Sequence, residues 1–197
     1  MDSEITIRTA QLTDLEELSE LYEKLMREQM AFDRFAQILD SADFQKLVFS
    51  YLTSGKSKFF LAEKNREILG FIRLSIYSGA KLERVDTLKP ELVWKKFYPR
   101  RILRKILSWL LNRIEKSIDS SLIFRQLRVG YIADMFIKQE ARERGVGNLL
   151  TNHAFNWFRE RKVSMIYLQA LSENHPGVSF WKRQGFSIFR VFMRREI

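Results

Sequence analysis

The sequence predicts an α/β fold, a mixed central β-sheet flanked by helices, within a single domain spanning residues 1–197. Three observations predict it. Short apolar runs of strand composition alternate with longer segments of helical period, as in proteins whose helices cover both faces of a sheet. The 197 residues, 46% of them hydrophobic, suffice for one core and show no break in composition or linker. Two closely spaced glycines separate a strand from a helix in the C-terminal half.

The N-terminal half predicts a strand and two helices. Ile5 and Ile7 lie on one face of a short strand, and Thr13 precedes acidic residues as a helix N-cap does. Apolar residues then recur at three- and four-residue spacing, which predicts an amphipathic helix: Leu15, Leu18, Tyr22 and Leu25. A shorter helix fits residues 41–52.

A β-hairpin follows, with strands near residues 58–63 and 68–77 around the polar sequence EKNRE. The next segment, about residues 81–128, interrupts the alternation of strands and helices. Within it, residues 91–116 carry eight positive and two negative charges, and isoleucines and leucines recur every four residues after Pro99. We therefore predict a basic, helical insertion between the third and fourth strands.

The C-terminal half predicts a strand, a helix and a second strand, at residues 130–137, 146–161 and 164–171. A further helix and a last strand, IFRVFMRRE at residues 188–196, complete the order of elements.

The sequence EARERGVGNLL, residues 140–150, lies between the first of these strands and the helix. Unpaired backbone N–H groups and the helix dipole make such a helix N-terminus a site for anions. Glycines at 145 and 147 would let a phosphate approach and let the turn adopt unusual dihedral angles. An ordinary turn with tight helix packing is the alternative interpretation of Gly145 and Gly147.

The sequence resembles the GNAT superfamily of acetyl-CoA-dependent N-acetyltransferases. The family's Gln/Arg-x-x-Gly-x-Gly/Ala loop is matched at Arg142, Gly145 and Gly147. Its later block, Asn-x-x-Ala-x-x-Phe-Tyr-x-x-x-Gly-Phe, is matched at four positions: Asn174, Phe180, Gly185 and Phe186. The order of elements fits the family from Glu4 onwards, except in the insertion, where relatives usually have a short connection.

The resemblance implies a GNAT-like fold that holds acetyl-CoA between the strand ending at Ile137 and the strand that follows the helix. The amide of Phe136 or Ile137 would polarise the thioester oxygen. The pyrophosphate would lie against consecutive residues of the loop and helix start: Arg142, Glu143, Arg144, Gly145, Val146, Gly147 and Asn148. Asn174 would orient the later loop or touch the pantetheine, or would simply cap a helix.

Catalysis needs a group that takes the amine proton, for which Asp134 is our candidate, and a group that protonates the thiolate. The alternative for Asp134 is a structural carboxylate that fixes the strand or pairs with a neighbouring arginine, which is a common use of aspartate. The family's usual acid is a tyrosine, and Trp181 stands in its place. An indole N–H donates hydrogen bonds but does not deliver a proton, so we expect weakened acid catalysis or another donor.

Composition limits the remaining functions. With no cysteine and two histidines, we expect no metal site and no disulfide, and a cytoplasmic protein. The net charge of +10 favours an anionic partner, which acetyl-CoA satisfies. The basic insertion is compatible with nucleic-acid or anionic membrane contact through residues 91–116, although a helix docked on the domain is the favoured interpretation.

The expected activity is acetyl transfer to a primary amine of a small metabolite or a protein. The alternative is a catalytically weak acyl-CoA-binding sensor or regulatory module, which Trp181 keeps open. A homodimer is compatible with the sequence.

Overall fold

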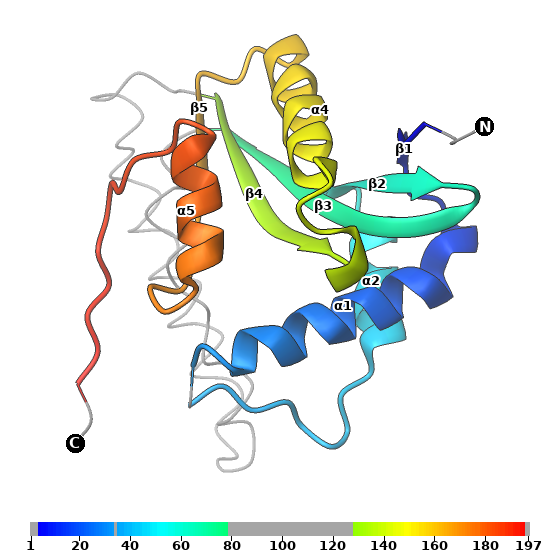
Figure 1. Ribbon diagram of the computed structural model, residues 1–197, viewed down its shortest axis with the longest axis horizontal. Helices are drawn as coiled ribbons and strands as arrows, with labels where there is room; N and C mark the ends of the chain where they lie inside the picture. Colours follow the sequence, from blue (N-terminus) through cyan, green and yellow to red (C-terminus); the bar gives the residue numbers. More distant parts are fainter. Residues whose placement is uncertain (1–3, 34, 79–127, 196–197) are drawn as a thin grey trace, which may run out of the picture.

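The computed structural model describes residues 4–33, 35–78 and 128–195. A five-stranded sheet with the order β1-β2-β3-β4-β5 forms the centre (Figure 1). Successive strands pair antiparallel, except that β4 and β5 run parallel. This is the mixed sheet that the sequence predicts. The predicted insertion and its basic segment 91–116 lie outside the described residues.

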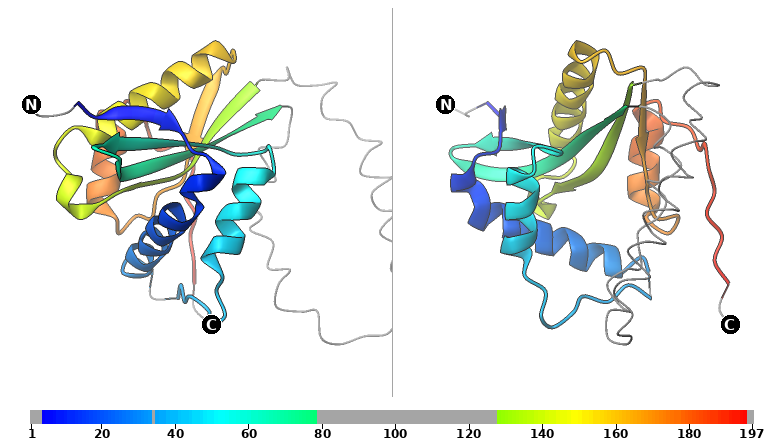
Figure 2. Two further views of the ribbon diagram at one scale, coloured as in Figure 1. Left: turned by 90° about the vertical axis from the view of Figure 1, so that its right-hand side faces the viewer. Right: turned by 180° about the vertical axis from the view of Figure 1, so that it is seen from behind.

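The N-terminal part supplies the first edge strand and two helices. These are β1 (Thr6–Thr9), the 3-10 turn η1 (Leu12–Asp14), α1 (Leu15–Met30) and α2 (Phe44–Thr53). The helices α1 and α2 pack against the same face of the sheet (Figures 1 and 2). Thr13 lies inside η1, and Asp14 occupies the N-cap position of α1, so the predicted cap is wrong by one residue. The carboxylate of Asp14, already bonded to Arg8, accepts the backbone N–H of Gln11 at 2.7 Å, which favours the extra turn.

The hairpin β2 (Lys58–Lys64) and β3 (Glu67–Ser78) lies where the sequence predicts it. After the insertion come β4 (Arg128–Ile137), η4 (Gln139–Ala141), α4 (Val146–Glu160), β5 (Met165–Leu168) and α5 (His175–Arg183). Alternating apolar residues of β2, β3 and β4 face opposite sides of the sheet. One side, with Leu61 and Phe71, forms a core with α1 and α2, and the other, with Ile72 and Ile132, forms a core with α4.

The predicted last strand is wrong. Residues 187–195 form no helix or strand, and their apolar side chains are exposed: Ile188, Phe189, Val191, Phe192 and Met193. The chain runs away from α5 as an extended segment (Figure 1). Strand composition favours a strand only where a neighbouring strand supplies hydrogen bonds. Here the segment contacts β5 through the rings of Phe189 and Tyr167, 5.5 Å apart, and then reaches Asp33 through Arg194 at 3.0 Å.

In the described part of the chain, no helix is long and apolar enough to cross a membrane.

Candidate functional site

The connection between β4 and α4 ends in a left-handed residue. Gly145, the N-cap residue of α4, has φ 80°, a conformation that costs other residues about 1–2 kcal/mol. The first helical hydrogen bond runs from the N–H of Leu149 to the carbonyl of Gly145 at 3.1 Å. The N–H groups of the three intervening residues therefore have no partner within the helix and point out of its N-terminus. This is the geometry that binds anions.

The two glycines of this turn have different roles. A Cβ added at Gly145 would have no atom within 4 Å, so the space directly in front of this residue is open. A Cβ at Gly147 would lie 3.1 Å from the ring of Phe180 and 3.1 Å from Cδ1 of Ile137. Gly147 thus permits close packing of α4 on α5 and β4, whereas Gly145 provides the turn and the access.

Arg142 connects the turn to α1. Its Nη2 donates to both carboxylate oxygens of Glu28 at 2.7 Å, and its Nε donates to the carbonyl of Ile137 at 3.0 Å. The side chains of Arg142 and Glu28 are 42% and 44% exposed, so solvent screens the pair and it contributes about 0–1 kcal/mol. An anionic ligand at the turn can therefore displace Glu28 from Arg142 at small cost.

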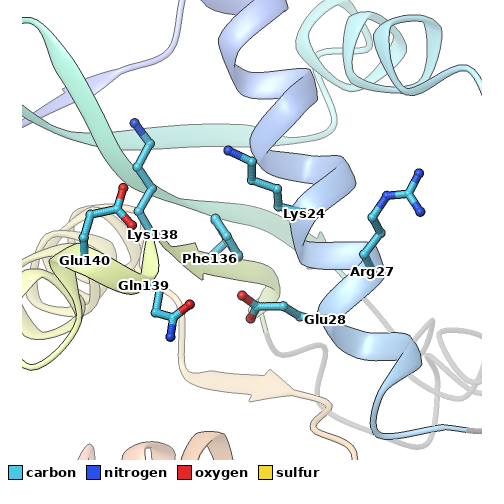
Figure 3. Close-up of a pocket in the computed structure, with 7 residues that line it drawn as sticks. All are labelled: Lys24, Arg27, Glu28, Phe136, Lys138, Gln139 and Glu140. Atoms are coloured by element: carbon cyan, nitrogen blue, oxygen red, sulfur yellow. The ribbon is translucent and has the colours of Figure 1, made fainter.

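A depression of about 340 Å³ lies beside this ion pair, between α1 and the end of β4 (Figure 3). Its lining includes charged side chains of both signs: Lys24, Arg27, Glu28, Phe136, Lys138, Gln139 and Glu140. Lys24 and Glu28 extend from α1 towards the ring of Phe136, whereas Arg27 points away from it (Figure 3). Lys138 is fixed at the rim by Glu67, 2.9 Å away, and by Glu17, 3.6 Å away.

The strand β5 pairs along its whole length with β4, but only with the first half of β4. Their parallel register ends at Ile132 opposite Leu168, and β5 itself ends there. From Ala133 onwards the edge of β4 that faces away from β3 has no neighbouring strand among the described residues. The sheet thus opens beside the second half of β4.

Alternation along β4 decides which backbone amides face this opening. The N–H of Lys138 donates to the carbonyl of Leu69 on β3 at 2.9 Å. In an antiparallel pair, N–H groups of alternate residues point to the same side, so the amide of Phe136 also turns towards β3. The amides of Met135 and Ile137 point the other way, into the opening.

Asp134 lies on the α1 face of β4 and is bound by two donors. Its Oδ2 accepts from Nε of Arg73 at 2.6 Å and from the hydroxyl of Tyr22 at 3.0 Å. The side chains of Arg73 and Asp134 are only 14% and 9% exposed. Among the described residues, no side chain donates a hydrogen bond to Oδ1 of Asp134.

The surrounding groups keep fixed charges near neutral pH. Burial, with the charge of Asp134, raises the pKa of Tyr22, and the same two causes raise the pKa of Tyr131. Burial lowers the pKa of Arg73, but the charge and hydrogen bond of Asp134, together with the neighbouring tyrosines Tyr22 and Tyr51, outweigh burial, so this pKa is raised overall. Both tyrosines are therefore neutral hydroxyls and Arg73 is a cation throughout the range of ordinary assays.

The helix α5 carries the two remaining predicted site residues. Asn174 is its N-cap, with Oδ1 accepting the N–H of Gly177 at 3.0 Å. Trp181 is half-buried among aromatic rings, 4.9 Å from Phe180 and 5.5 Å from Phe186 between ring centroids. Trp181 thus fills space between α5 and the α4 face of the sheet.

The structure brings the predicted loop residues, from Arg142 to Asn148, together at one helix start, with Ile137 and Phe136 beside them. Asp134 lies on the α1 face of the sheet, and Trp181 packs on the α4 face. Sequence reasoning missed Arg73, although a single charge inside the apolar run GFIRLSIY is a signal that a buried partner exists.

Sequence reasoning also missed Glu28 and the role of the Tyr22 hydroxyl, for which the sequence holds no local signal. Among the described residues, no group of three or more histidine, aspartate or glutamate side chains is arranged to hold a metal.

Comparisons with known proteins agree with this architecture. The family model described as Acetyltransferase (GNAT) family matches residues 16–186. The chain therefore belongs to the GNAT acetyltransferase family, as its motifs predict. No curated protein sequence matches the chain significantly.

Solved structures show the same fold at low identity. A mutant protein from Bacillus halodurans is 14% identical with a TM-score of 0.69, covering 98% of this chain and 99% of its own. The ribosomal-protein-alanine N-acetyltransferase of Brucella melitensis biovar Abortus 2308 is 12% identical with a TM-score of 0.58, covering 98% and 100%. An aminoglycoside acetyltransferase from an uncultured soil metagenomic sample, in complex with sisomicin, is 12% identical with a TM-score of 0.57, covering 98% and 96%.

Proposed function

We propose that this protein transfers the acetyl group of acetyl-CoA to a primary amine by direct attack of the amine on the thioester. The turn at Gly145 carries the proposal, because it combines a left-handed backbone, open space and outward-pointing amides directly after the strand whose edge is free. A diphosphate fits these features, since each favours a close, negatively charged ligand.

The donor would lie along the opening beside β4. The amides of the turn and of the first residues of α4 would hold its pyrophosphate, and Arg142 would add a charge after exchanging Glu28 for phosphate. The amide of Ile137 would bind the thioester oxygen, with that of Met135 beside it, because the amide of Phe136 turns towards β3. Asn174, as the cap of α5, would orient the loop after β5.

The reaction forms a C–N bond and breaks a C–S bond, and it moves two protons. An ammonium of pKa about 10.4 needs roughly 4–5 kcal/mol to become a free amine at neutral pH, so a proton acceptor is required. Asp134 would receive this proton through water at Oδ1, to which no described residue donates, or would hold the amine. A thiolate of pKa about 8.5 costs only about 2 kcal/mol to release, so transfer proceeds, more slowly, without the family's tyrosine at position 181.

The acceptor is a primary amine of a small molecule or of a protein. Two similar structures belong to enzymes named for an aminoglycoside and for the alanine of a ribosomal protein. We therefore propose a panel containing polyamines, aminoglycosides, lysine peptides and peptides with free N-termini, in which release of CoA thiol from acetyl-CoA is measured for each.

Amine-dependent thiol release would support the proposed function, and its loss in a Gly145→Glu variant would connect it to the turn. CoA binding without release for any amine would favour the sensor instead. No binding of CoA by the folded protein would overturn both.

A further inference from the structure

The place where the sheet opens coincides with a bulge in β4. Arg73 pairs with Asp134, but the next residue of β3, Leu74, pairs with Ile132, so Ala133 is an extra residue on β4. The β4–β5 register ends at the same Ile132. A β-bulge interrupts the ladder and bends its strand, so its geometry sets the direction of the residues that follow.

Side chains tie this bulge to β3 and to both helices of its face. We call them the clamp: Arg73, Asp134, Tyr22, Tyr51 and Ser57. Arg73 Nε binds the carboxylate of its cross-strand partner at 2.6 Å. Its Nη1 donates to Oγ of Ser57 at 3.3 Å, and its guanidinium lies 4.0 Å from the ring centroid of Tyr51 on α2. Tyr22 of α1 closes the arrangement at 3.0 Å from the same carboxylate oxygen.

The contacts of the clamp restrict the orientation of both Arg73 and Asp134. Its cation and anion are both largely buried and neutralise each other, and the Tyr22 hydroxyl that donates to Asp134 is neutral. A guanidinium held by a carboxylate, a hydroxyl and an aromatic face has little rotational freedom. Asp134 is therefore fixed immediately after the bulged residue and immediately before Met135, whose amide faces the opening.

We infer that Arg73 is a positioning residue for acetyl transfer: by holding Asp134 to β3 across the bulge at Ala133, it aims the amides of Met135 and Ile137 at the thioester oxygen. This inference rests on the proposed function, because it concerns the same donor site. Arg73 touches neither substrate directly. Its effect should appear in turnover and in the polarisation of the bound carbonyl, and not in the affinity for CoA, which depends on the turn at Gly145.

The test compares Arg73→Gln with Arg8→Gln, a matched control in the first edge strand. Arg8 also binds carboxylates, Asp14 at 2.8 Å and Glu63 at 2.6 Å, but it lies at the opposite edge of the sheet from the opening. For each protein, calorimetry gives the affinity for CoA, thiol release gives kcat, and infrared spectroscopy gives the carbonyl stretch of bound ¹³C-labelled acetyl-CoA.

We expect Arg73→Gln to lower kcat by about 10- to 100-fold, because small misplacements of reacting groups have effects of that size. The carbonyl stretch should move towards its value in water, and CoA affinity should change less than about twofold. Arg73→Lys, which keeps the charge without the planar fork, should recover only part of the loss. Arg8→Gln should match the wild type in all three measurements.

Two further variants guard against misfolding, because Arg73→Gln leaves a buried carboxylate unpaired. The double variant Arg73→Gln/Asp134→Asn removes both charges, and Tyr22→Phe removes one donor while keeping the ring that stacks on Phe71 at 5.8 Å. The inference would be overturned if these variants fold and keep the wild-type kcat and carbonyl stretch. It would also be overturned if they lose only CoA affinity, with kcat and the carbonyl stretch unchanged. A wild-type protein that binds no acetyl-CoA would instead overturn the proposed function first.

Discussion

The turn before α4 gives the sharpest prediction: Gly145→Glu should weaken CoA binding at least tenfold. Nothing lies within 4 Å of a Cβ at this position, so a side chain leaves the backbone without a clash, and we expect the carboxylate to enter the space proposed for the pyrophosphate. Two unit charges about 6 Å apart, at an effective dielectric constant of about 40, repel by roughly 1.4 kcal/mol, which is a factor of ten in affinity. A diphosphate carries more than one charge, so this value is a lower bound.

Backbone strain accompanies this substitution and needs a control. Gly145 has φ 80°, where a side chain costs about 1–2 kcal/mol of stability. Gly55, in the turn between α2 and β2, has φ 66° and equally open surroundings, so Gly55→Glu has the same strain and charge away from the turn. Calorimetry with CoA at low and high salt should show a defect only in Gly145→Glu, reduced by salt. Equal CoA affinity in the two folded variants would refute the phosphate assignment.

Three further predictions concern the carboxylates of Glu28 and Asp134 and the missing general acid at Trp181. Glu28→Gln should tighten CoA binding about two- to fivefold in calorimetry, because the exposed ion pair of Glu28 with Arg142, worth up to about 1 kcal/mol, no longer competes with phosphate. Weaker binding would show that Glu28 instead orients Arg142 for the ligand. Asp134→Asn should lower turnover most at neutral pH and recover in part as rising pH supplies free amine, while a loss independent of pH would contradict proton transfer. Trp181→Tyr should raise turnover several-fold at unchanged CoA affinity, and unchanged turnover between pH 6 and 9 in a folded variant would exclude a missing acid at this position.

The predicted parts of the molecule are those that local sequence determines. Helical spacing and strand alternation placed α1, α4 and the hairpin to within a few residues, because burying one face imposes that periodicity. The turn at Gly145 was also predictable, because Gly145 and the start of α4 are neighbours in the chain. A last strand at residues 188–196 was predicted from composition alone and is wrong, since composition does not supply a hydrogen-bonding neighbour.

The clamp was not predictable because its contacts join distant parts of the chain. Tyr22 and Asp134 are 112 residues apart, Arg73 and Asp134 are 61 apart, and Glu28 and Arg142 are 114 apart. The helical spacing of Tyr22 predicts only a core residue. The hydrogen bond of its hydroxyl to Asp134 can be recognised only when the position of β4 relative to α1 is known. The sequence alone left Asp134 either a proton acceptor or a paired carboxylate, and the structure shows the pairing with Arg73.

The helix α1 links the two ends of the proposed donor site. Tyr22 reaches the clamp at the bulge, and Glu28 reaches Arg142 at the turn, so one helix contacts β4 where the sheet opens and the loop where β4 ends. Six residues of α-helix span about 9 Å, which fixes the separation of these contacts more rigidly than a loop would. Exchange of Glu28 for a phosphate would release the second contact, while the buried clamp, which does not include Glu28, retains the first. Donor binding should therefore loosen the C-terminal end of α1, next to the connection that leads to α2, and leave the bulge unchanged. Hydrogen exchange with and without CoA distinguishes these ends: faster exchange after Glu28 with constant protection around Tyr22 is the expected result, and uniform protection of α1 would contradict it.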